Sequence, residues 1–588
     1  MLFPDTGLDL LARFLSPWHE VGLGSPVAAA PYTVLVAAVT PVFLGSATAA
    51  LQILLLLAPA LAGLALFLSL RGVLPTPARV VAAVAYAFLP ATVIAVDTGR
   101  LGMAVAAILL PFATRLLLRI SGFATPLPVG RTRTVAAAAF VVAALGAFSP
   151  ALGVTSVILA AAAALVGRHG SGLARVIVVA LAAAALLWPW SPSVLATPGM
   201  LLLDLGAHPA RLAADAAPAW QIALLNPGGP VAGPAWIAAA LAVAALLALI
   251  PAVTRRAVVS AWVVILAGLV LALVQSLAQV DAPWSEQPVA AWPGAGTLVM
   301  GLGACTAVAV ALGALRSGAL PARIGVVVAM VAPVMVGGWW VFTGDSLIRR
   351  SEPTIISPFV AVASLGPDAP RSLELHQRPD GSVTYQLLSG SGPRLGDAET
   401  APDAAGLVDF GSAVSRATAG SPQAVAELAA ASVRFLTVDV TIDRPLARQL
   451  DAVPGIRRVS TLAGQGLWEV ATPLPRTRAI TAEGPVGIPT DVTGASPLAR
   501  GPVPGSANSL TLAEAPDPVW RATLAGAELE RIDGSWQAFT IPTDATGDVA
   551  VSVDPTSRLL SLIVPAVAAL LLVVAAMRPT GTARKENR

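Results

Sequence analysis

The stretch from Val135 to Val166 reads VAAAAFVVAALGAFSPALGVTSVILAAAAALV and contains no charged residue. A helix needs about 20 apolar residues to cross the hydrocarbon core of a membrane, so this run is too long for a single crossing. Ser149-Pro150 lies near its middle, and proline removes a backbone hydrogen bond from any helix that runs through it. We therefore predict two membrane-spanning helices that form a hairpin at this dipeptide.

The whole chain has the composition of an integral membrane protein. Hydrophobic residues make up 56% of the sequence and charged residues 12%, whereas soluble domains contain about 25% charged residues. The mean hydropathy is +0.78. No basic cluster with interleaved aromatic residues indicates a nucleic-acid partner. We predict eleven spans, at approximately 50–70, 79–96, 101–119, 134–148, 150–167, 173–195, 235–253, 257–276, 296–316, 323–343 and 558–577.

Arginine positions predict how these spans are oriented. Loops that carry arginine alternate along the chain with loops that are poor in it, and cytoplasmic loops are enriched in arginine and lysine. This threading predicts a multi-pass protein of the plasma membrane, with the polar stretch 344–557 outside the cytoplasm. It also places on the outer side every carboxylate between Met1 and Thr343, namely Asp5, Asp9, Glu20, Asp97, Asp204, Asp215, Asp281 and Glu286.

The N-terminal part is expected to lie outside as well. The segment Ala28–Leu44 is apolar, but it is short and contains Pro31 and Pro41. We therefore expect it to lie in the outer interface or to re-enter the membrane. No signal peptide with a basic start and an apolar core precedes it. The chain is accordingly expected to be the later part of a longer protein, or to have an incorrectly assigned start.

Two sequence patterns divide the polar stretch. The first part reads as mixed α/β, and its Asp380-Gly381 pair predicts a hairpin. The second part holds short strands separated by turn residues, which is typical of a small β-sandwich. The predicted domains are a multi-span membrane domain with an outer first loop at 1–343, an extracytoplasmic α/β domain at 344–475, an extracytoplasmic β-sandwich at 476–557, and a final span with a basic cytoplasmic tail at 558–588. The predicted elements are helices at 424–431 and 445–452, and strands at 433–438, 457–461, 466–470, 509–513, 520–524, 528–532, 537–541 and 549–553.

Four short segments resemble parts of known envelope proteins. They are WHEVGLGS at 18–25, YAFLP at 86–90, GRLG at 99–102 followed by Leu110-Pro111, and PDPVWRATLAG at 516–526. The first three resemble the membrane region of large actinobacterial proteins, in which a cytoplasmic family 2 glycosyltransferase domain precedes several spans. The fourth resembles a strand pair found near the end of those proteins and of multi-span GT-C-type glycosyltransferases. The family 2 catalytic domain, with its Asp-x-Asp motif, is absent from this sequence, so its activity does not carry over.

The resemblance implies a GT-C-like helical bundle that takes sugar from a polyprenyl-phosphate donor on the outer face. Such a transfer uses a carboxylate to remove the proton of the acceptor hydroxyl, and a cation to hold the lipid phosphate. The working carboxylate of that fold usually sits in the first outer loop, where this chain has Asp5, Asp9 and Glu20. Arg100, beside Asp97 on the next outer turn, is the best placed cation for the donor phosphate.

Structural roles account for the same residues. Solvent-exposed outer loops commonly contain a few acidic residues that have no function. Asp97 and Arg100 would then cap and pair across their turn, for about 0–1 kcal/mol. Trp18 is interpreted as an anchor at the membrane surface, where tryptophan is enriched. The spacing of His208, Asp204 and Asp215 matches no recognised metal-ligand pattern. A divalent cation stays open as a cofactor, without assigned ligands.

Together these observations predict the membrane and extracytoplasmic part of an actinobacterial cell-envelope glycosyltransferase. The expected substrates are a lipid-linked sugar donor and an envelope glycan or glycolipid. The expected partners are membrane lipids and a cytoplasmic glycosyltransferase domain or protein. Two alternatives stay open, namely a non-catalytic scaffold or export module for such an enzyme, and a transporter. No charge lies at the centre of a predicted span, which argues against a coupled transporter.

Overall fold

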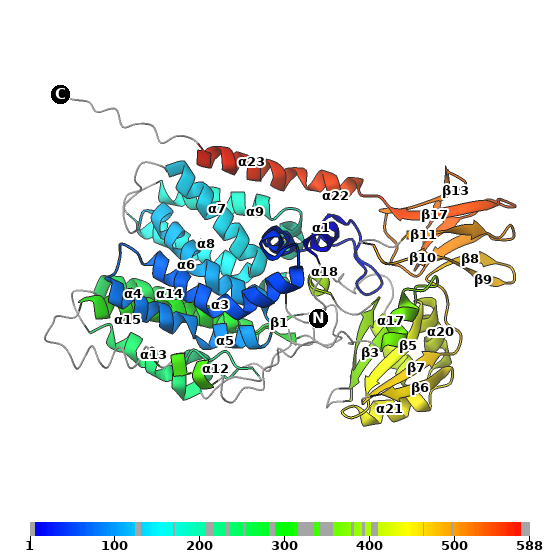
Figure 1. The fold of residues 1–588 in the computed structure, drawn as a ribbon, viewed down its shortest axis with the longest axis horizontal. Helices are drawn as coiled ribbons and strands as arrows, with labels where there is room; N and C mark the ends of the chain where they lie inside the picture. The colour runs from blue at the N-terminus through cyan, green and yellow to red at the C-terminus, as the bar shows by residue number, and fades with distance from the viewer. Residues whose placement is uncertain are drawn as a thin grey trace. The chain divides into compact units, whose positions relative to one another are not determined.

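The structure is a computed structural model of the 588-residue chain. Two compact units are found, one within Met1–Ala37 and Arg350–Leu560, the other within Ala38–Val280, Val289–Arg349 and Ser561–Arg588 (Figure 1). The N-terminal segment, which the sequence assigned to the membrane domain, thus belongs to the same unit as the polar stretch. The residues described are 6–123, 131–167, 171–196, 198–206, 217–229, 235–250, 255–280, 289–314, 331, 333–335, 337–339, 357–377, 381–390, 394–400, 410–462, 464–494 and 498–577.

Apolar helices long enough to cross a membrane make this a multi-pass membrane protein. Among the described residues there are 5 such helices, or up to 7 if each of two bent helix pairs is one span. The prediction of eleven spans is therefore not confirmed, and the predicted span at 323–343 lies largely outside the described residues. The five are α3 (Ala47–Ser69), α6 (Leu101–Ser121), α14 (Arg255–Leu277), α15 (Gly294–Ala314), and the stretch Thr556–Met577, which holds α22 (Thr556–Ser561) and α23 (Ile563–Met577).

The hairpin predicted in the uncharged run is confirmed. α7 (Arg131–Phe148) ends and α8 (Pro150–Val166) begins on either side of Ser149, which occupies the N-cap position of α8. The two helices have 18 and 17 residues. At a rise of about 1.5 Å per residue they are slightly shorter than the hydrocarbon core of roughly 30 Å. Their length is the reason that these two apolar helices do not count among the long spans.

Two further predicted spans are bent rather than continuous. The helices of one pair meet at 42°, and those of the other at 103°. A proline lies at each break, Pro90 in the first and Pro189 in the second, and proline cannot donate the hydrogen bond that would continue the preceding helix. The pairs are α4 (Thr76–Ala87) with α5 (Pro90–Asp97), and α9 (Gly172–Leu186) with α10 (Trp190–Ala196).

Close packing of α14 against α15 fixes the centre of the helical unit. Gly268 of α14 and Gly296 of α15 allow the two backbones to touch, since a Cβ on Gly296 would lie 2.2 Å from Ala272 N. α15 begins two residues after Trp292, so this packing also sets the position of that ring. The unit also contains η1 (Thr40–Phe43), η2 (Pro198–Leu202), α12 (Ala219–Ala223), α13 (Ala235–Leu247), β1 (Gln279–Val280) and β2 (Val289–Ala290).

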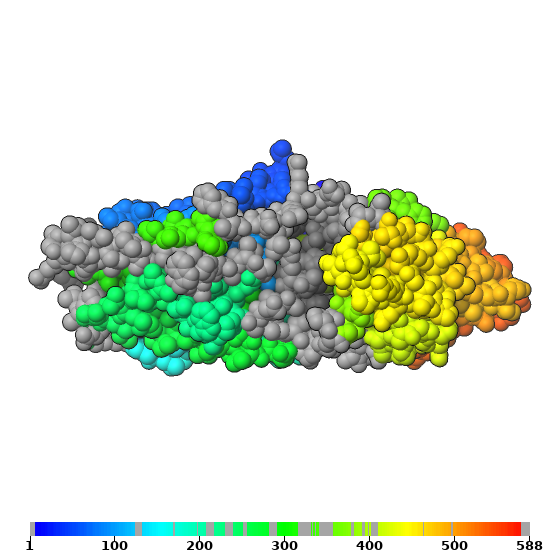
Figure 2. Space-filling view, turned by 90° about the horizontal axis from the view of Figure 1, so that it is seen from below, coloured from blue at the N-terminus to red at the C-terminus, as the bar shows by residue number. Residues whose placement is uncertain are grey.

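The α/β part of the first unit is a five-stranded sheet in the order β4-β3-β5-β7-β6. Only the β3–β5 pair is parallel. The helices α19, α20 and α21 pack against one face, and α17 packs against Phe435 and Leu467 on the other. The space-filling view shows this part (yellow) as a rounded body (Figure 2). The bounds are β3 (Arg371–Gln377), β4 (Val383–Leu388), β5 (Val433–Asp439), β6 (Ile456–Leu462), β7 (Gln465–Val470), α17 (Pro358–Ser364), α18 (Asp397–Thr400), α19 (Phe410–Thr418), α20 (Pro422–Ala430) and α21 (Arg444–Asp451).

Two further five-stranded sheets follow, in the orders β10-β11-β17-β13-β14 and β15-β16-β12-β8-β9. Leu510 and Phe539 from one sheet and Val551 from the other share a single buried core. The strand predicted at 528–532 is divided between the two sheets as β14 and β15, so the chain crosses from one sheet to the other there. The bounds are β8 (Thr477–Thr481), β9 (Gly484–Ile488), β10 (Thr490–Asp491), β11 (Leu498–Val503), β12 (Ser509–Leu512), β13 (Trp520–Leu524), β14 (Ala527–Glu528), β15 (Arg531–Ile532), β16 (Gln537–Thr540) and β17 (Gly547–Val553).

The N-terminal segment forms two helices. α1 (Gly7–Leu15) belongs to the first unit, and α2 (Tyr32–Val39) extends across the boundary between the two units. The Trp18 side chain is fully buried in the core of the two sheets and meets Trp520 edge-on, with ring centroids 5.2 Å apart. The prediction that Trp18 anchors the chain at the membrane surface is therefore wrong, because its indole ring completes a protein core.

Candidate functional site

Glu20 lies in a buried group of charged side chains in the first unit. Glu514 Oε1 accepts hydrogen bonds from Arg371 Nη2 at 2.8 Å and from Arg476 Nε at 2.7 Å. Arg476 Nη2 lies 3.2 Å from Glu20 Oε1. The least buried of these side chains, Glu20, is 8% exposed. We call Glu20, Arg371, Arg476 and Glu514 the Arg371–Arg476 cluster.

Strand ends bring this cluster together. Arg371 begins β3, Arg476 immediately precedes β8, and Glu514 follows β12 by two residues. The pairing of β8 with β12 continues past their ends, because Ala513 N donates to Arg476 O at 2.8 Å. The Arg371 guanidinium also donates to the carbonyl oxygens of Ala431 and Ala513. The cluster therefore joins the α/β sheet to the two-sheet part.

Glu20 is the loosely held member of the cluster. Neither of its carboxylate oxygens has a hydrogen-bond partner in the described part of the chain, so its contact with Arg476 is mainly Coulombic. Burial raises the pKa of Glu20, and the Arg476 charge opposes that shift. Burial likewise lowers the pKa of Arg371, to about 10. In this arrangement Glu20 attaches the N-terminal segment to the sheets, while its predicted role as a catalytic base stays a prediction.

The other predicted carboxylates of the first loop occupy different settings. Asp5 lies outside the described residues. Asp9 lies in the first turn of α1, where its Oδ2 accepts from Thr6 N at 3.0 Å and from Thr6 Oγ1 at 2.8 Å. Thr6 Oγ1 accepts in turn from Asp9 N, which completes a capping box. Asp9 is exposed and Glu20 is buried, so the structure does not bring these two together.

Arg100 lies in a second buried group, in the helical unit. Its Nη1 donates to Asp204 Oδ2 at 2.6 Å, and both side chains are less than 5% exposed. The guanidinium carbon lies 4.5 Å from the ring centroid of Trp292, a cation–π distance. Trp292 Nε1 donates to Gly228 O at 2.9 Å, which fixes the ring. We call Arg100, Asp204 and Trp292 the Arg100 cluster.

The turn between α5 and α6 positions Arg100. α5 ends at Asp97, which is fully buried, and Gly99 takes a φ of +68° that favours glycine. Arg100 then occupies the N-cap position of α6. The sequence assigned Asp97 and Arg100 to the donor phosphate, with an ion pair across their turn as the structural alternative, and the ion pair found for Arg100 is with Asp204. Sequence reasoning missed this partner although Asp204 is one of only eight carboxylates in the first 343 residues.

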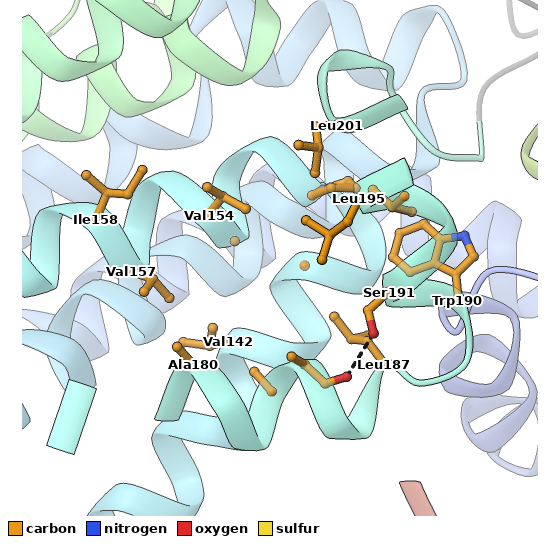
Figure 3. A pocket seen from close by; sticks show the side chains of 16 residues that line it. Val142, Val154, Val157, Ile158, Ala180, Leu187, Trp190, Ser191, Leu195 and Leu201 are labelled. Carbon is orange, nitrogen blue, oxygen red and sulfur yellow. Dashed lines mark hydrogen bonds between the residues drawn. The ribbon is translucent and has the colours of Figure 1, made fainter. Parts of the chain in front are cut away.

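An apolar groove of about 240 Å³ lies among α7, α8, α9, α10 and η2 (Figure 3). Its wall is formed almost entirely by carbon. Valine, leucine and isoleucine side chains point into it. Among the lining residues only Trp190 and Ser191 have a polar side-chain atom, and the Ser191 hydroxyl donates to Ala184 O. Such a surface suits a hydrocarbon chain. The labelled residues are Val142, Val154, Val157, Ile158, Ala180, Leu187, Trp190, Ser191, Leu195 and Leu201.

A short stretch of chain connects this groove to the Arg100 cluster. Leu201 lines the groove, and Asp204 follows it by three residues, which span at most about 11 Å when fully extended. The stretch is held at both ends, because Leu202 O accepts from Gln275 Nε2 at 3.3 Å and Leu205 O accepts from Gly102 N at 3.0 Å. A hydrocarbon-lined groove thus lies close to a buried guanidinium, a combination that can hold a lipid with an anionic head.

Metal ligation has little support among the described residues. No group of three or more His, Cys, Asp or Glu side chains that could hold a metal ion is found there. His208 and Asp215, weighed above for this role, lie outside the described residues. The described side chains therefore do not locate the divalent cation that the sequence left open.

Comparison with known proteins gives a likeness of fold. No family model and no curated protein matches this chain. The cryo-EM structure of the arabinofuranosyltransferase AftD from Mycobacteria matches with a TM-score of 0.50 and 13% identity, covering 94% of this chain and 55% of that chain. A mutant of the same enzyme matches with a TM-score of 0.48 and 13% identity. This chain thus spans about half the length of the solved enzyme. The family 2 part of the expected resemblance gains no support, and the chain shares the fold of an arabinofuranosyltransferase.

Proposed function

We propose that this chain is the membrane part of a cell-envelope glycosyltransferase. It would transfer sugar from a polyprenyl-phosphate donor to an envelope glycan or glycolipid on the outer face of the plasma membrane. The observation that carries the proposal is the Arg100 cluster next to an apolar groove, within a fold shared with an arabinofuranosyltransferase. Arabinofuranose is therefore the first sugar to test.

The donor would bind along the groove and end at the Arg100 cluster. The polyprenyl chain would lie against the groove wall, and its phosphate would compete with the Asp204 carboxylate for the Arg100 guanidinium. Guanidinium groups bind phosphate and carboxylate with the same planar donors. Asp97, at the end of α5, belongs to the same turn, and its proposed role is to orient the Arg100 guanidinium rather than to contact the phosphate, since two anions repel. Burial would strengthen the attraction, since charges interact more strongly away from water.

The transfer itself needs an acid–base partner. The acceptor oxygen forms a bond to the anomeric carbon while the bond from that carbon to the phosphate oxygen breaks. The acceptor proton passes to a carboxylate, and the electron pair leaves with the lipid phosphate, whose charge Arg100 stabilises. The proposed carboxylate is one of Asp5, Asp9 and Glu20 in the first loop. Asp9 is exposed and can meet an acceptor directly, whereas Glu20 would first have to leave Arg476.

The test is transfer from synthetic polyprenyl-phosphoryl arabinofuranose to an arabinan acceptor, using the full chain in lipid nanodiscs. Arg100→Gln should lower kcat/KM about 100-fold or more, the usual cost of removing one group that stabilises developing charge. Arg115→Gln is the matched control, because Arg115 lies on the same helix and donates to Leu68 O and Ser69 O instead. Equal activity of Arg100→Gln and Arg115→Gln would overturn the assignment of Arg100.

A second candidate function is a non-catalytic scaffold or export module for a cytoplasmic glycosyltransferase. It is favoured by the ion pair that holds Glu20 inside a structural cluster. Under this reading Asp5→Asn, Asp9→Asn and Glu20→Gln all leave transfer unchanged, and the chain alone shows no transfer. Loss of transfer in one of the three, with normal membrane insertion, would support catalysis by this chain.

A further inference from the structure

The helix α1 leaves an apolar stripe uncovered. Gly7 and Leu10 face the protein and are buried. Leu8, Leu11 and Leu15 are 78%, 37% and 37% exposed. Three exposed leucines at positions i, i+3 and i+7 of a nine-residue helix are costly in water. We therefore expect another apolar surface to cover this stripe.

The geometry of α1 separates three kinds of surface. Successive residues of an α-helix are about 100° apart, so Leu8, Leu11 and Leu15 fall within about 60° of one another around the axis. Asp9 and Arg13 fall together on another side. Arg13 is already engaged there in an ion pair with Asp397. A helix with a protein-facing side, a polar side and an exposed apolar side is typical of helices that lie in a membrane interface.

Contacts at the end of α1 tie it to the start of a membrane span. Arg558 Nε and Nη2 donate to Phe14 O at 3.0 Å and 2.6 Å. The Arg558 guanidinium carbon also lies 4.7 Å from the centroid of the Phe14 ring. Arg558 belongs to α22, the first part of the candidate span Thr556–Met577. The C-terminal end of α1 is thus fixed beside the residues through which that span enters the membrane.

The surface next to this contact is also apolar. Leu559 and Leu560, which directly follow Arg558, are 53% and 60% exposed. Phe14, the neighbour of Leu15 at the end of the stripe, therefore contacts a segment that must itself meet lipid. This continuity identifies the occupant by its chemistry, since the hydrocarbon of a bilayer covers both surfaces at once.

We propose that α1 is an interfacial helix whose stripe of Leu8, Leu11 and Leu15 lies in the lipid leaflet that the span Thr556–Met577 enters first. The partner is a phospholipid surface rather than another protein. Asp9 and Arg13 face away from the acyl chains, and Leu10 holds the helix to the first unit. This proposal does not depend on the proposed activity.

Site-specific fluorescence in nanodiscs tests the proposal. Cys305 is buried and is the only native cysteine, so a Cys305→Ser background carries Leu11→Cys or Leu15→Cys, labelled with an environment-sensitive dye. The nanodiscs contain phosphatidylcholine and phosphatidylglycerol, with and without doxyl-labelled lipid. Thr543→Cys, in an exposed turn of the two-sheet part, is the control. Leu8→Cys, at the most exposed leucine, serves as a second variant if either of the other two folds poorly.

The expected result is several-fold stronger quenching by doxyl lipid, and several-fold weaker quenching by iodide, at Leu11 and Leu15 than at Thr543. Labels at those leucines that iodide quenches as strongly as the label at Thr543 would overturn the proposal. Labels shielded from both quenchers would also overturn it, because they would show that a protein surface covers the stripe.

Discussion

Two buried arginine clusters in this chain use the same side-chain chemistry in different ways. The Arg371–Arg476 cluster sets two arginines against two glutamates, so its formal charges cancel, and its members come from four separate segments of the chain. The Arg100 cluster sets one arginine against one carboxylate and an indole ring. The first joins two bodies of β-structure. The second lies within a few residues of an apolar groove.

This difference shows that burial of charge is not by itself a mark of a functional site. A balanced cluster whose members come from four segments dictates how those segments meet. A single pair beside a groove leaves room for an anion to take the place of one partner. We therefore expect the first cluster to respond to mutation mainly through stability, and the second mainly through ligand binding.

The largest expected effect is the loss of folding stability when Arg476 is replaced. Arg476→Ala leaves Glu20 and Glu514 buried without this partner, and breaking a buried ion pair costs about 3–5 kcal/mol of folding stability. Chemical unfolding of the full chain, followed by the fluorescence of Trp18 and Trp520, measures this loss. Arg521→Ala is the control, because the Arg521 side chain is 49% exposed and its removal should cost less than about 0.5 kcal/mol. Equal losses of stability in the two variants would show that the Arg371–Arg476 cluster does not stabilise the fold more than an exposed ion pair does.

The sharpest test of the comparison is rescue by a lipid phosphate. Asp204→Asn and Glu514→Gln both leave a buried arginine without its carboxylate, and both should lower stability. Polyprenyl phosphate at 100 times its dissociation constant should restore about 2.7 kcal/mol to Asp204→Asn, because a ligand that binds only the folded state stabilises it. The same lipid should leave the melting temperature of Glu514→Gln unchanged. Rescue of both variants, or of neither, would contradict the different roles given to the two clusters.

An acid-sensitive contact should loosen the N-terminal segment next to Glu20. Burial and the charges of Arg13 and Arg558 lower the pKa of His19 to about 3, below the value of about 6.5 in an unfolded chain. Between these values only the unfolded state binds the proton, so folding stability falls as the pH falls. From pH 6.5 to pH 5 the loss should be about 2 kcal/mol.

The variant His19→Gln isolates this contribution from the opposite one made by Glu20. Stability measured from pH 7 to pH 5 should fall less steeply in His19→Gln than in the wild-type chain. Parallel pH profiles of the two proteins would show that His19 does not stay neutral in the folded state.

An exposed ion pair gives the smallest effect and the baseline for the others. Arg416 Nη2 lies 2.6 Å from Glu427 Oε2, and these side chains are 50% and 38% exposed. Arg416→Ala should cost about 0–1 kcal/mol, since water screens the pair. The same unfolding experiment measures it. A cost comparable with that of Arg476→Ala would show that burial does not decide the difference between the pairs.

Local sequence signals predicted those parts of the fold that depend on neighbouring residues. Ser149-Pro150 marked the helical hairpin, and the strand at 433–438 and the helix at 445–452 were found close to their observed positions. The number of spans is not confirmed, since the described residues hold 5 long apolar helices, or up to 7 if each bent pair is one span, and apolar composition does not reveal where proline bends a helix. Pro90 and Pro189 divide two runs that read as continuous.

The candidate sites depend on contacts that no local pattern encodes. The sequence singled out Arg100 by its turn, but its partner Asp204 lies 104 residues further along the chain. Trp18 was misread because its burial depends on Trp520, in a sheet formed far later in the chain. Arg371, Arg476 and Glu514 were missed for the same reason, since strand ends from three places bring them together.

The contact between Phe14 and Arg558 also bears on how the protein is made. The two residues are separated by 544 positions. At a synthesis rate of about 5–20 residues per second, Phe14 waits roughly half a minute to two minutes after its own synthesis before Arg558 is made. Through that interval α1 lacks its contact with Arg558, although Arg13 in its last turn can already pair with Asp397 once that residue is made. The contact between α1 and α22 thus forms late in synthesis, after every strand of the first unit has been made.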